Sequence, residues 1–138
     1  MALILDTGPL YALLDRSDNR HEDCRSLVES SEEALVLPAP VVVEVNFLIR
    51  TRLHPAVMVS LLDDVISGFY RVESLIAEDH VRARELVERY ADSDIGFVDA
   101  AVMAVVERMD EPKLMTLDRR HFGAIKPRHV EVLRLLPD

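Results

Sequence analysis

The sequence predicts an α/β fold in which a mostly parallel central sheet of about five strands is flanked by helices on both faces, as in a three-layer sandwich. Short apolar segments that suit buried strands alternate with longer segments of helical periodicity, which is the order that a parallel sheet requires. The 138 residues are enough for one domain, 1–138, with its own hydrophobic core. No repeat or linker divides the chain.

The expected strands are short, and helices fill the intervals between them. Strands are expected at 2–6, 33–38, 69–75, 113–118 and 130–136. One helix begins at Thr7-Gly8-Pro9, and the other helices are expected at 19–30, 39–53, 55–69, 77–91 and 96–109. In the fourth of these, Met58, Leu61, Leu62 and Val65 are expected to form one inward face. The helix at 96–109 is so apolar that a central position is predicted, and a loop is expected to join the last two strands.

Composition and charge narrow the classes of function. Apolar residues make up 49% of the chain and charged residues 30%, a mix typical of globular proteins. No apolar stretch approaches the roughly 20 residues of a membrane span, and no signal-type segment opens the chain, so a cytoplasmic protein without membrane contact is expected. The net charge of -9 disfavours a broad phosphate-binding surface, although all basic residues except Lys113 and Lys126 are arginines, which bind phosphate well.

Four acidic residues stand inside apolar segments, whereas most of the 25 Asp and Glu residues lie in turns and polar helix faces. Asp6 and Asp118 end predicted strands, Glu44 interrupts "VVVEVNFLI", and Asp99 interrupts "FVDAAVMAVV". Each one alone could cap a helix, hold a turn or pair with a buried arginine. Together they need compensating positive charge, because desolvated carboxylates are costly and these segments contain no Lys or Arg.

A divalent cation would supply that charge. Carboxylate oxygens favour Mg²⁺ or Mn²⁺, whereas zinc would favour His or Cys. Such an ion suits phosphodiester hydrolysis, because it lowers the pKa of water and stabilises the charge of the transition state. The sequence contains no G-x-S-x-G elbow, Walker A loop or G-x-G-x-x-G motif. The five histidines show no ligand spacing, and His121, although it follows Asp118 closely, is expected at the surface.

Four segments resemble the PIN-domain ribonucleases and, among them, the VapC-type toxins of type II toxin-antitoxin systems. These segments are "LILDTGPLYALLD", "PAPVVVEV", "DIGFVDAAVMAVVER" and "LMTLDRRHFGAI", which together span nearly the whole chain. The resemblance implies a PIN-like sandwich in which Asp6, Glu44, Asp99 and Asp118 coordinate Mg²⁺ or Mn²⁺ and catalyse RNA hydrolysis. It also implies that Thr7 and Thr116 lie beside the metal. Asp94 is a further contributor to the site or the N-cap of the helix at 96–109.

The same resemblance implies partners. An RNA substrate would be cut to 5′-phosphate and 3′-hydroxyl ends and held by the arginines nearest the motifs in sequence, which are Arg50, Arg52, Arg119 and Arg120. A small antitoxin protein would cover the active site. A homodimer is also implied, and the segment 55–69 offers an apolar face for it unless that face belongs to the core.

Three other functions are compatible with parts of the sequence. One is a housekeeping PIN-type nuclease that processes RNA, and another is a PIN-like domain that binds RNA or protein without cutting. The third is a dimeric aspartic protease, because Asp6-Thr7-Gly8 is a tripeptide that those enzymes carry. Aspartic proteases are nearly all β, however, whereas helical periodicity dominates this chain.

Overall fold

The structure is a computed structural model that describes residues 1–138. It contains five strands, seven α-helices and one 3-10 helix. The strands are β1 (Ala2–Ile4), β2 (Ala34–Pro38), β3 (Tyr70–Glu73), β4 (Lys113–Met115) and β5 (Arg134–Leu136). The helices are α1 (Thr7–Leu14), α2 (His21–Ser30), α3 (Ala39–Arg52), α4 (Ala56–Ile66), α5 (Ala77–Arg89), η1 (Ala91–Ser93), α6 (Phe97–Arg108) and α7 (Arg119–Ala124).

All strands run parallel, in the spatial order β3-β2-β1-β4-β5. The expected α/β class with a parallel sheet is thus confirmed, but the ladder is not continuous. The main sheet has three strands, β1 to β3, and β4 and β5 form a second ladder. A single bridge between Leu5 and Met115 joins the two, supported by the backbone hydrogen bond from Asp6 N–H to the Met115 carbonyl at 2.9 Å.

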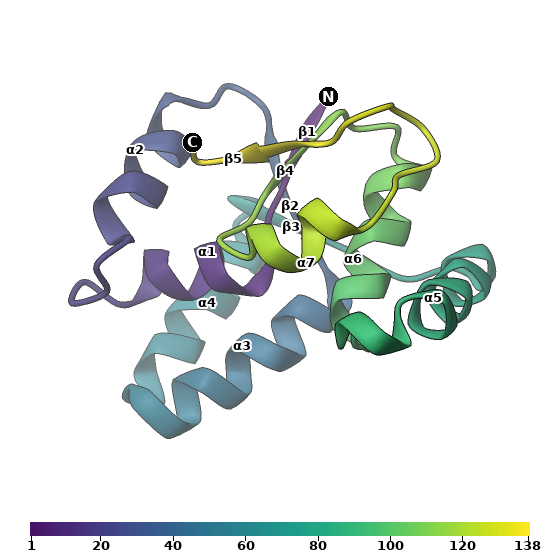
Figure 1. The fold of residues 1–138 in the computed structure, drawn as a ribbon. Coiled ribbons are helices and arrows are strands. Elements are labelled where there is room, and N and C mark those ends of the chain that lie inside the picture. Colours follow the sequence, from purple (N-terminus) through teal and green to yellow (C-terminus); the bar gives the residue numbers. More distant parts are fainter.

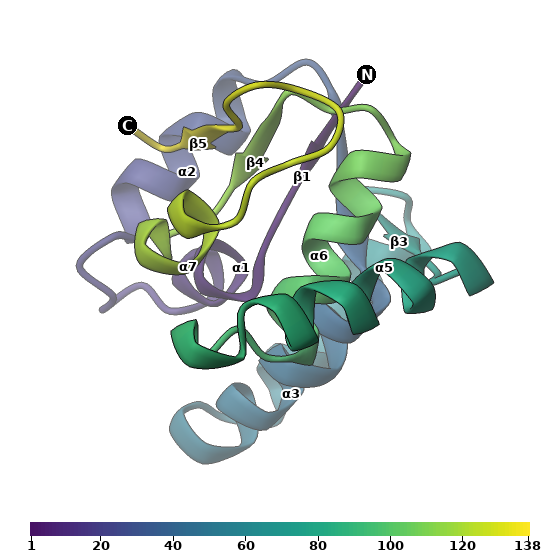
Figure 2. The same cartoon turned by 45° about the vertical axis from the view of Figure 1, so that its right-hand side comes forward.

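Helices cover both sides of the strands (Figures 1 and 2). The pair α1 and α2 lies on one side, and the pair α5 and α6 lies on the other, in both views. The helices α3 and α4 form a hairpin that projects beyond the carboxyl ends of the strands (Figure 1). Chain order explains this placement, because α3 begins immediately after β2 ends.

The helix α6 lies at the centre of the core, as its composition predicts. Every residue from Ala100 to Val106 is buried, because α6 contacts α3, α5 and β2 at once. The helix also carries Glu107, whose carboxylate accepts two hydrogen bonds, at 2.8 and 3.0 Å, from the buried Arg82 guanidinium of α5. These bonds fix α5 against the end of α6 that lies away from Asp99. None of the helices is long and apolar enough to cross a bilayer.

Three local expectations are wrong. The segment after Asp118 is the helix α7 rather than a loop, since the Asp118 side chain caps it by accepting a hydrogen bond from His121 N–H. Strand β5 covers only Arg134–Leu136, so the first four residues of the expected strand at 130–136 lie outside it. On α4, Leu61 is buried and Met58 and Val65 pack against the core, but Leu62 is exposed. The inward face of α4 is therefore narrower than its apolar pattern predicts.

Candidate metal centre

Asp6 lies where the order of the sheet reverses, between the carboxyl ends of β1 and β4. Ligand sites of parallel α/β sheets form at this switch point, because helices leave the two neighbouring strands in opposite directions. The backbone of Leu5 donates to Val36 in β2, and the next backbone N–H, that of Asp6, donates to Met115 in β4. Asp6 is thereby held between two strands, and its side chain is only 5% exposed.

Thr116 connects Asp6 to Asp118. Its hydroxyl donates a hydrogen bond to Asp6 Oδ2 at 2.9 Å and accepts one from the Asp118 backbone N–H at 3.0 Å. Thr116 itself is fixed by its backbone N–H, which donates to the Leu136 carbonyl in β5. The buried hydroxyl therefore orients a carboxylate from one ladder against the backbone of the other.

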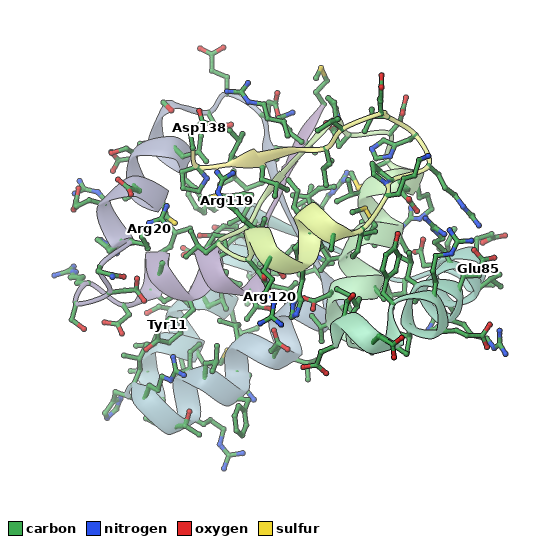
Figure 3. The ribbon with its side chains drawn as sticks, viewed as in Figure 1. Tyr11, Arg20, Glu85, Arg119, Arg120 and Asp138 are labelled. Atoms are coloured by element: carbon green, nitrogen blue, oxygen red, sulfur yellow. The ribbon has the colours of Figure 1, made fainter.

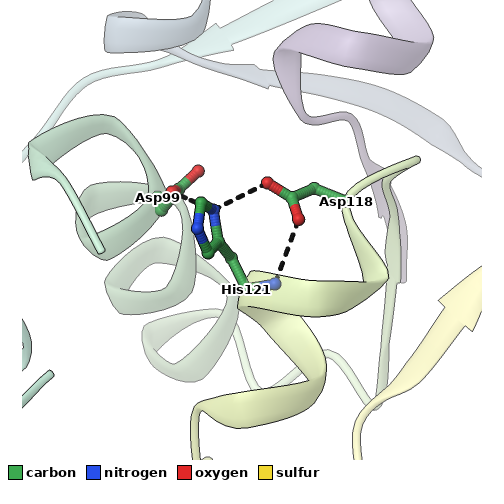
Figure 4. Close-up of side chains that lie close together, drawn as sticks. All are labelled: Asp99, Asp118 and His121. Atoms are coloured by element: carbon green, nitrogen blue, oxygen red, sulfur yellow. Dashed lines mark hydrogen bonds and ion pairs between the residues drawn. The ribbon is translucent and has the colours of Figure 1, made fainter. Parts of the chain in front are cut away.

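Asp99 and Asp118 approach each other through His121 (Figure 4). His121 Nδ1 lies 2.8 Å from Asp118 Oδ2 and 3.2 Å from Asp99 Oδ2. The three side chains offer ligand atoms that all lie within 4.8 Å of one another. Asp99 occupies the first turn of α6, Asp118 caps α7, and His121 is the third residue of α7, so the starts of two helices bring them together.

Glu44 extends from α3 toward the same charges, but it is exposed, contrary to the expectation of a desolvated side chain. The buried face of α3 is formed by Val41, Val45 and Ile49, and the apolar residues next to Glu44 on the other face are exposed as well. Glu44 nevertheless acts on the cluster electrostatically, because its charge raises the pKa of both Asp6 and Asp99.

The electrostatics of the four acids show that they are close. Burial raises the pKa of Asp6 from 3.8 to about 7; the charges of Asp99 and Glu44 add to the rise, while the Thr7 backbone and the Thr116 hydroxyl oppose it. Burial also raises the pKa of Asp99, and the charges of Asp118 and Glu44 add to that shift while His121 opposes it. Residues far apart in the sequence thus form one cluster in which negative charge is costly without a compensating positive charge.

The donor set fits a divalent cation. Asp99, Asp118 and His121 form the group whose ligand atoms are close enough for one ion, and Asp6 and Glu44 lie outside that group. The carboxylates of Asp6, Asp99 and Asp118 offer oxygen atoms at graded depth, from the buried Asp6 to the partly exposed Asp118 (37%). The hydroxyl of Thr7, at the first position of α1, is buried and has no hydrogen-bond partner. Unpaired buried polar groups and clustered carboxylates are what a bound ion with its water ligands would satisfy.

Asp94 and the two arginines of α7 were also expected near the site. Asp94 is exposed in a left-handed conformation (φ 58°), its side chain makes no hydrogen bond, and its backbone N–H donates to the Ala91 carbonyl at the end of η1. Gly96 is the N-cap of α6, so the capping role expected of Asp94 is wrong. Arg119 and Arg120 leave α7 in opposite directions (Figure 3). Arg119 donates to the carbonyls of Leu135 and Pro137, whereas the exposed Arg120 makes no hydrogen bond or ion pair.

The two arginines of α3 also differ. Arg52 lies over the ring of Tyr11, with its guanidinium carbon 5.3 Å from the ring centroid. Arg50 is exposed and has no partner. Of the four arginines expected to contact RNA, Arg50 and Arg120 are therefore the two whose guanidinium groups are free.

His121 is the residue of this site that the sequence did not indicate. Its expected surface position is wrong, since the side chain is 21% exposed and contacts two of the four acids. The available signal was the three-residue spacing after Asp118, which places two side chains on one face only if the segment is helical. The segment was expected to be a loop, so that spacing carried no weight.

An acidic cluster at the switch point of a parallel sheet defines a class of α/β proteins with a candidate metal site, and comparison with known proteins identifies the family. The model of the PIN domain matches residues 3–126, so the chain belongs to the PIN-domain family. It is similar to Ribonuclease VapC26 from Mycobacterium tuberculosis, with 32% identity over 125 residues that cover 91% of this chain and 93% of the relative. The expected resemblance to VapC-type proteins is confirmed.

Solved structures share the fold. VapC20 from Mycobacterium tuberculosis, described as a toxin that cleaves the sarcin-ricin loop, has a TM-score of 0.79 and 22% identity, with 94% of this chain and 98% of that chain covered. VapBC2 from Rickettsia felis, bound to a DNA fragment from their promoter, has a TM-score of 0.72 and 15% identity, with 99% and 100% covered. FitAcB from Neisseria gonorrhoeae has a TM-score of 0.71 and 17% identity, with 99% and 97% covered.

The raised pKa of Asp6 predicts an unusual dependence of stability on pH for the metal-free protein. Between pH 3.8 and about 7 the folded protein retains a proton that the unfolded chain releases, so the free energy of unfolding falls as the pH rises through this window and levels off above it. The total loss due to Asp6 is about 4 kcal/mol. Asp6→Asn removes the ionisable group and should raise the stability at pH 7.5 in EDTA, measured by urea denaturation.

The advantage of Asp6→Asn should shrink as the pH approaches 4. Asp23→Asn, on the exposed face of α2, is the matched control and should leave the pH profile unchanged. Equal stability of wild type and Asp6→Asn at pH 7.5 would mean that Asp6 is ionised in the folded protein at no cost.

Proposed function

We propose that this protein is an endoribonuclease dependent on Mg²⁺ or Mn²⁺ and that it is the toxin of a toxin-antitoxin pair. The observation that supports the proposal is the mutual proximity of Asp6, Glu44, Asp99 and Asp118, which come from different parts of the chain and whose charges act on one another. Membership of the PIN-domain family and the 32% identity to a protein named Ribonuclease VapC26 support it. The similarity to VapC20 shows the fold and adds no substrate.

In such a site, the role of each acid would follow from how deeply its side chain is buried. Asp6 forms the base of the pocket and is oriented by the Thr116 hydroxyl, while the more exposed Asp118 and Glu44 face arriving substrate. A divalent ion held by these carboxylates would lower the pKa of water and would offset the negative charge of the reacting phosphodiester. Asp6 must lose its proton to serve as a ligand, and its pKa of about 7 in the metal-free protein makes ion binding favour higher pH.

The substrate would be held locally rather than by the global charge. The protein carries a net charge of -9, which repels RNA, so cations at the site and nearby arginines must supply the attraction. Arg50 and Arg120 are exposed and unpaired, and we assign phosphate contacts to them. Arg119 is bound to the C-terminal backbone and Arg52 lies over Tyr11, so both have structural roles instead.

Two of the alternative functions remain within the family. A housekeeping RNA-processing nuclease would use the same acids, and a non-catalytic binding domain would have no need for all four. No observation favours either one over the toxin. The aspartic protease has no support, because Asp6-Thr7-Gly8 leads into the helix α1 of a parallel α/β fold.

The first prediction of this proposal concerns RNA cleavage. Purified protein should cleave single-stranded RNA with Mg²⁺ or Mn²⁺ and stop when EDTA is added. Asp6→Asn and Asp99→Asn should lower the cleavage rate by at least about a hundredfold, because each removes a ligand that stabilises developing charge. The control Asp23→Asn should cleave at the wild-type rate. Cleavage that survives both EDTA and Asp6→Asn would refute the proposal.

The partner of the toxin would bind in an apolar groove beside Glu44. This groove has a volume of about 750 Å³ and is lined by Ala39, Pro40, Val43, Glu44, Phe47, Leu75, His80, Phe97 and Val98. Phe47 is 65% exposed and Phe97 is 50% exposed. Large apolar residues that are exposed together in one patch are typical of a surface that binds a partner. Glu44, one of the four acids, lines this groove. We therefore assign the groove to an antitoxin segment with apolar side chains followed by a basic one, which would place positive charge on the acids.

If the antitoxin binds in this groove, a substitution in the groove should abolish inhibition by the partner without abolishing RNA cleavage. A short DNA-binding protein encoded next to this chain should co-purify with it, block RNA cleavage and relieve growth arrest caused by expression of the chain alone. Phe47→Ser should still cleave RNA but escape inhibition, since the variant loses buried apolar area only in the complex. Val132→Ser, which is exposed outside the groove, is the control and should remain inhibited. Inhibition of Phe47→Ser at the wild-type concentration of partner would contradict this assignment.

A second copy of the chain would cover the exposed apolar face of α4. Val59, Leu62 and Ile66 lie on one side of this helix, and Ile66 is 82% exposed. Phe69, just after the helix, is also exposed. A face of this kind can pack against its own copy around a two-fold axis, which makes it an isologous surface. We assign the homodimer interface to this face, within the segment 55–69.

If α4 forms the dimer interface, a substitution on its exposed face should change the oligomeric state of the protein without changing its fold. The wild-type protein should elute as a dimer in size-exclusion chromatography with light scattering. Ile66→Glu should convert it to a monomer with an unchanged circular dichroism spectrum, because a charge would be buried without a partner at the interface. Val132→Glu is an equally exposed control and should stay dimeric. A monomeric wild type, or a dimeric Ile66→Glu, would remove α4 from the interface.

A further inference from the structure

His121 lies between Asp99 and Asp118, two of the acids proposed to hold the metal. Its Nδ1 is buried and lies within 3.2 Å of a carboxylate oxygen from each of Asp99 and Asp118. Neither contact is aligned as a hydrogen bond. The nitrogen lies at ion-pair distance from both carboxylates, and the three side chains enclose one small space (Figure 4).

The distances match those between ligand atoms of one ion. Neighbouring ligands of an octahedral ion with bonds of about 2.1 Å are separated by about 3 Å, and the direction from a ligand atom to its neighbour lies about 45° from its bond to the ion. The His121 Nδ1 contacts, at 2.8 and 3.2 Å, have this separation, and their poor alignment is the misalignment that such geometry produces.

The ring is also fixed before any ion arrives. Asp118 Oδ1 accepts a hydrogen bond from the His121 backbone N–H at 3.0 Å, which begins α7, while Asp118 Oδ2 faces the ring nitrogen. One carboxylate therefore sets the backbone that carries the histidine and lines the same space as its Nδ1. Ligands held this way need little reorganisation to bind.

We propose that His121 is a direct nitrogen ligand of this metal site and that it makes the site select Mn²⁺ and other first-row transition ions over Mg²⁺. The inference rests on the proposed function, which supplies the oxygen ligands. Mg²⁺ strongly prefers oxygen and retains its waters, whereas imidazole nitrogen suits transition ions, whose affinity for nitrogen sites exceeds that of Mg²⁺. An all-carboxylate set would not produce this difference.

The test measures metal binding rather than catalysis. Isothermal titration calorimetry of the purified chain with MnCl₂ and with MgCl₂ gives the ratio of the two dissociation constants. His121→Ala and His121→Gln should each weaken Mn²⁺ binding by about tenfold or more while changing Mg²⁺ binding far less, so the selectivity ratio falls. His54→Ala removes an exposed imidazole elsewhere and should leave the ratio unchanged. Thermal melting in EDTA verifies that each variant is folded.

A spectroscopic measurement separates ligation from positioning. In protein labelled with ¹⁵N-histidine, the electron spin-echo modulation of bound Mn²⁺ should contain a ¹⁵N coupling that His121→Gln abolishes. Equal weakening of both ions, or an unchanged ratio, or a Mn²⁺ signal without that coupling, would overturn the assignment of His121 as a ligand. These results leave the proposed function standing, which would instead fail if the wild-type chain bound neither ion.

Discussion

Burial of the Asp6 carboxylate at the junction of β1 and β4 is the constraint on which the rest of the site depends. The group sits between two strands and is almost fully shielded from water, so its charge is expensive in the folded protein. The Thr116 hydroxyl and the Thr7 backbone offset part of this cost, while the charges of Asp99 and Glu44 increase it. A bound cation would offset this cost.

The sequence carried enough information for the fold class and for the convergence of the acids. Alternation of apolar strands with helices predicts a parallel sheet, and parallel strands end at one edge, so Asp6 and Asp118 had to lie near each other. What it could not supply was the side of α3 that faces solvent. Val43 and Phe47 belong to the same apolar segment as the buried Val41 and Val45, yet they line an exposed groove, and Glu44 among them is exposed rather than desolvated. Hydrophobic periodicity does not distinguish a surface that meets the core from one that meets a partner.

The same limit applies to α4, where Leu62 was expected inside and lies outside. The omission of His121 has a different cause. The helix α7 has only six residues, too few for a periodic pattern, and its start depends on the capping bond that Asp118 makes in the folded chain. A short helix that forms because of one side chain is invisible to window-based patterns. The residue that such a helix carries into a site is therefore the one most easily overlooked.

Because the ladder between β1 and β4 is incomplete, metal binding would also affect how firmly the two parts of the sheet are held together. One bridge and one backbone hydrogen bond connect the two ladders, and two side chains add links: the Thr116 hydroxyl, which donates to Asp6, and the Glu111 carboxylate, which accepts from Ala2 N–H. Asp6 follows the first ladder, and Asp118 and His121 follow the second. An ion bound to residues from both ladders would link them, so the stability of the folded protein would depend on the concentration of metal around it.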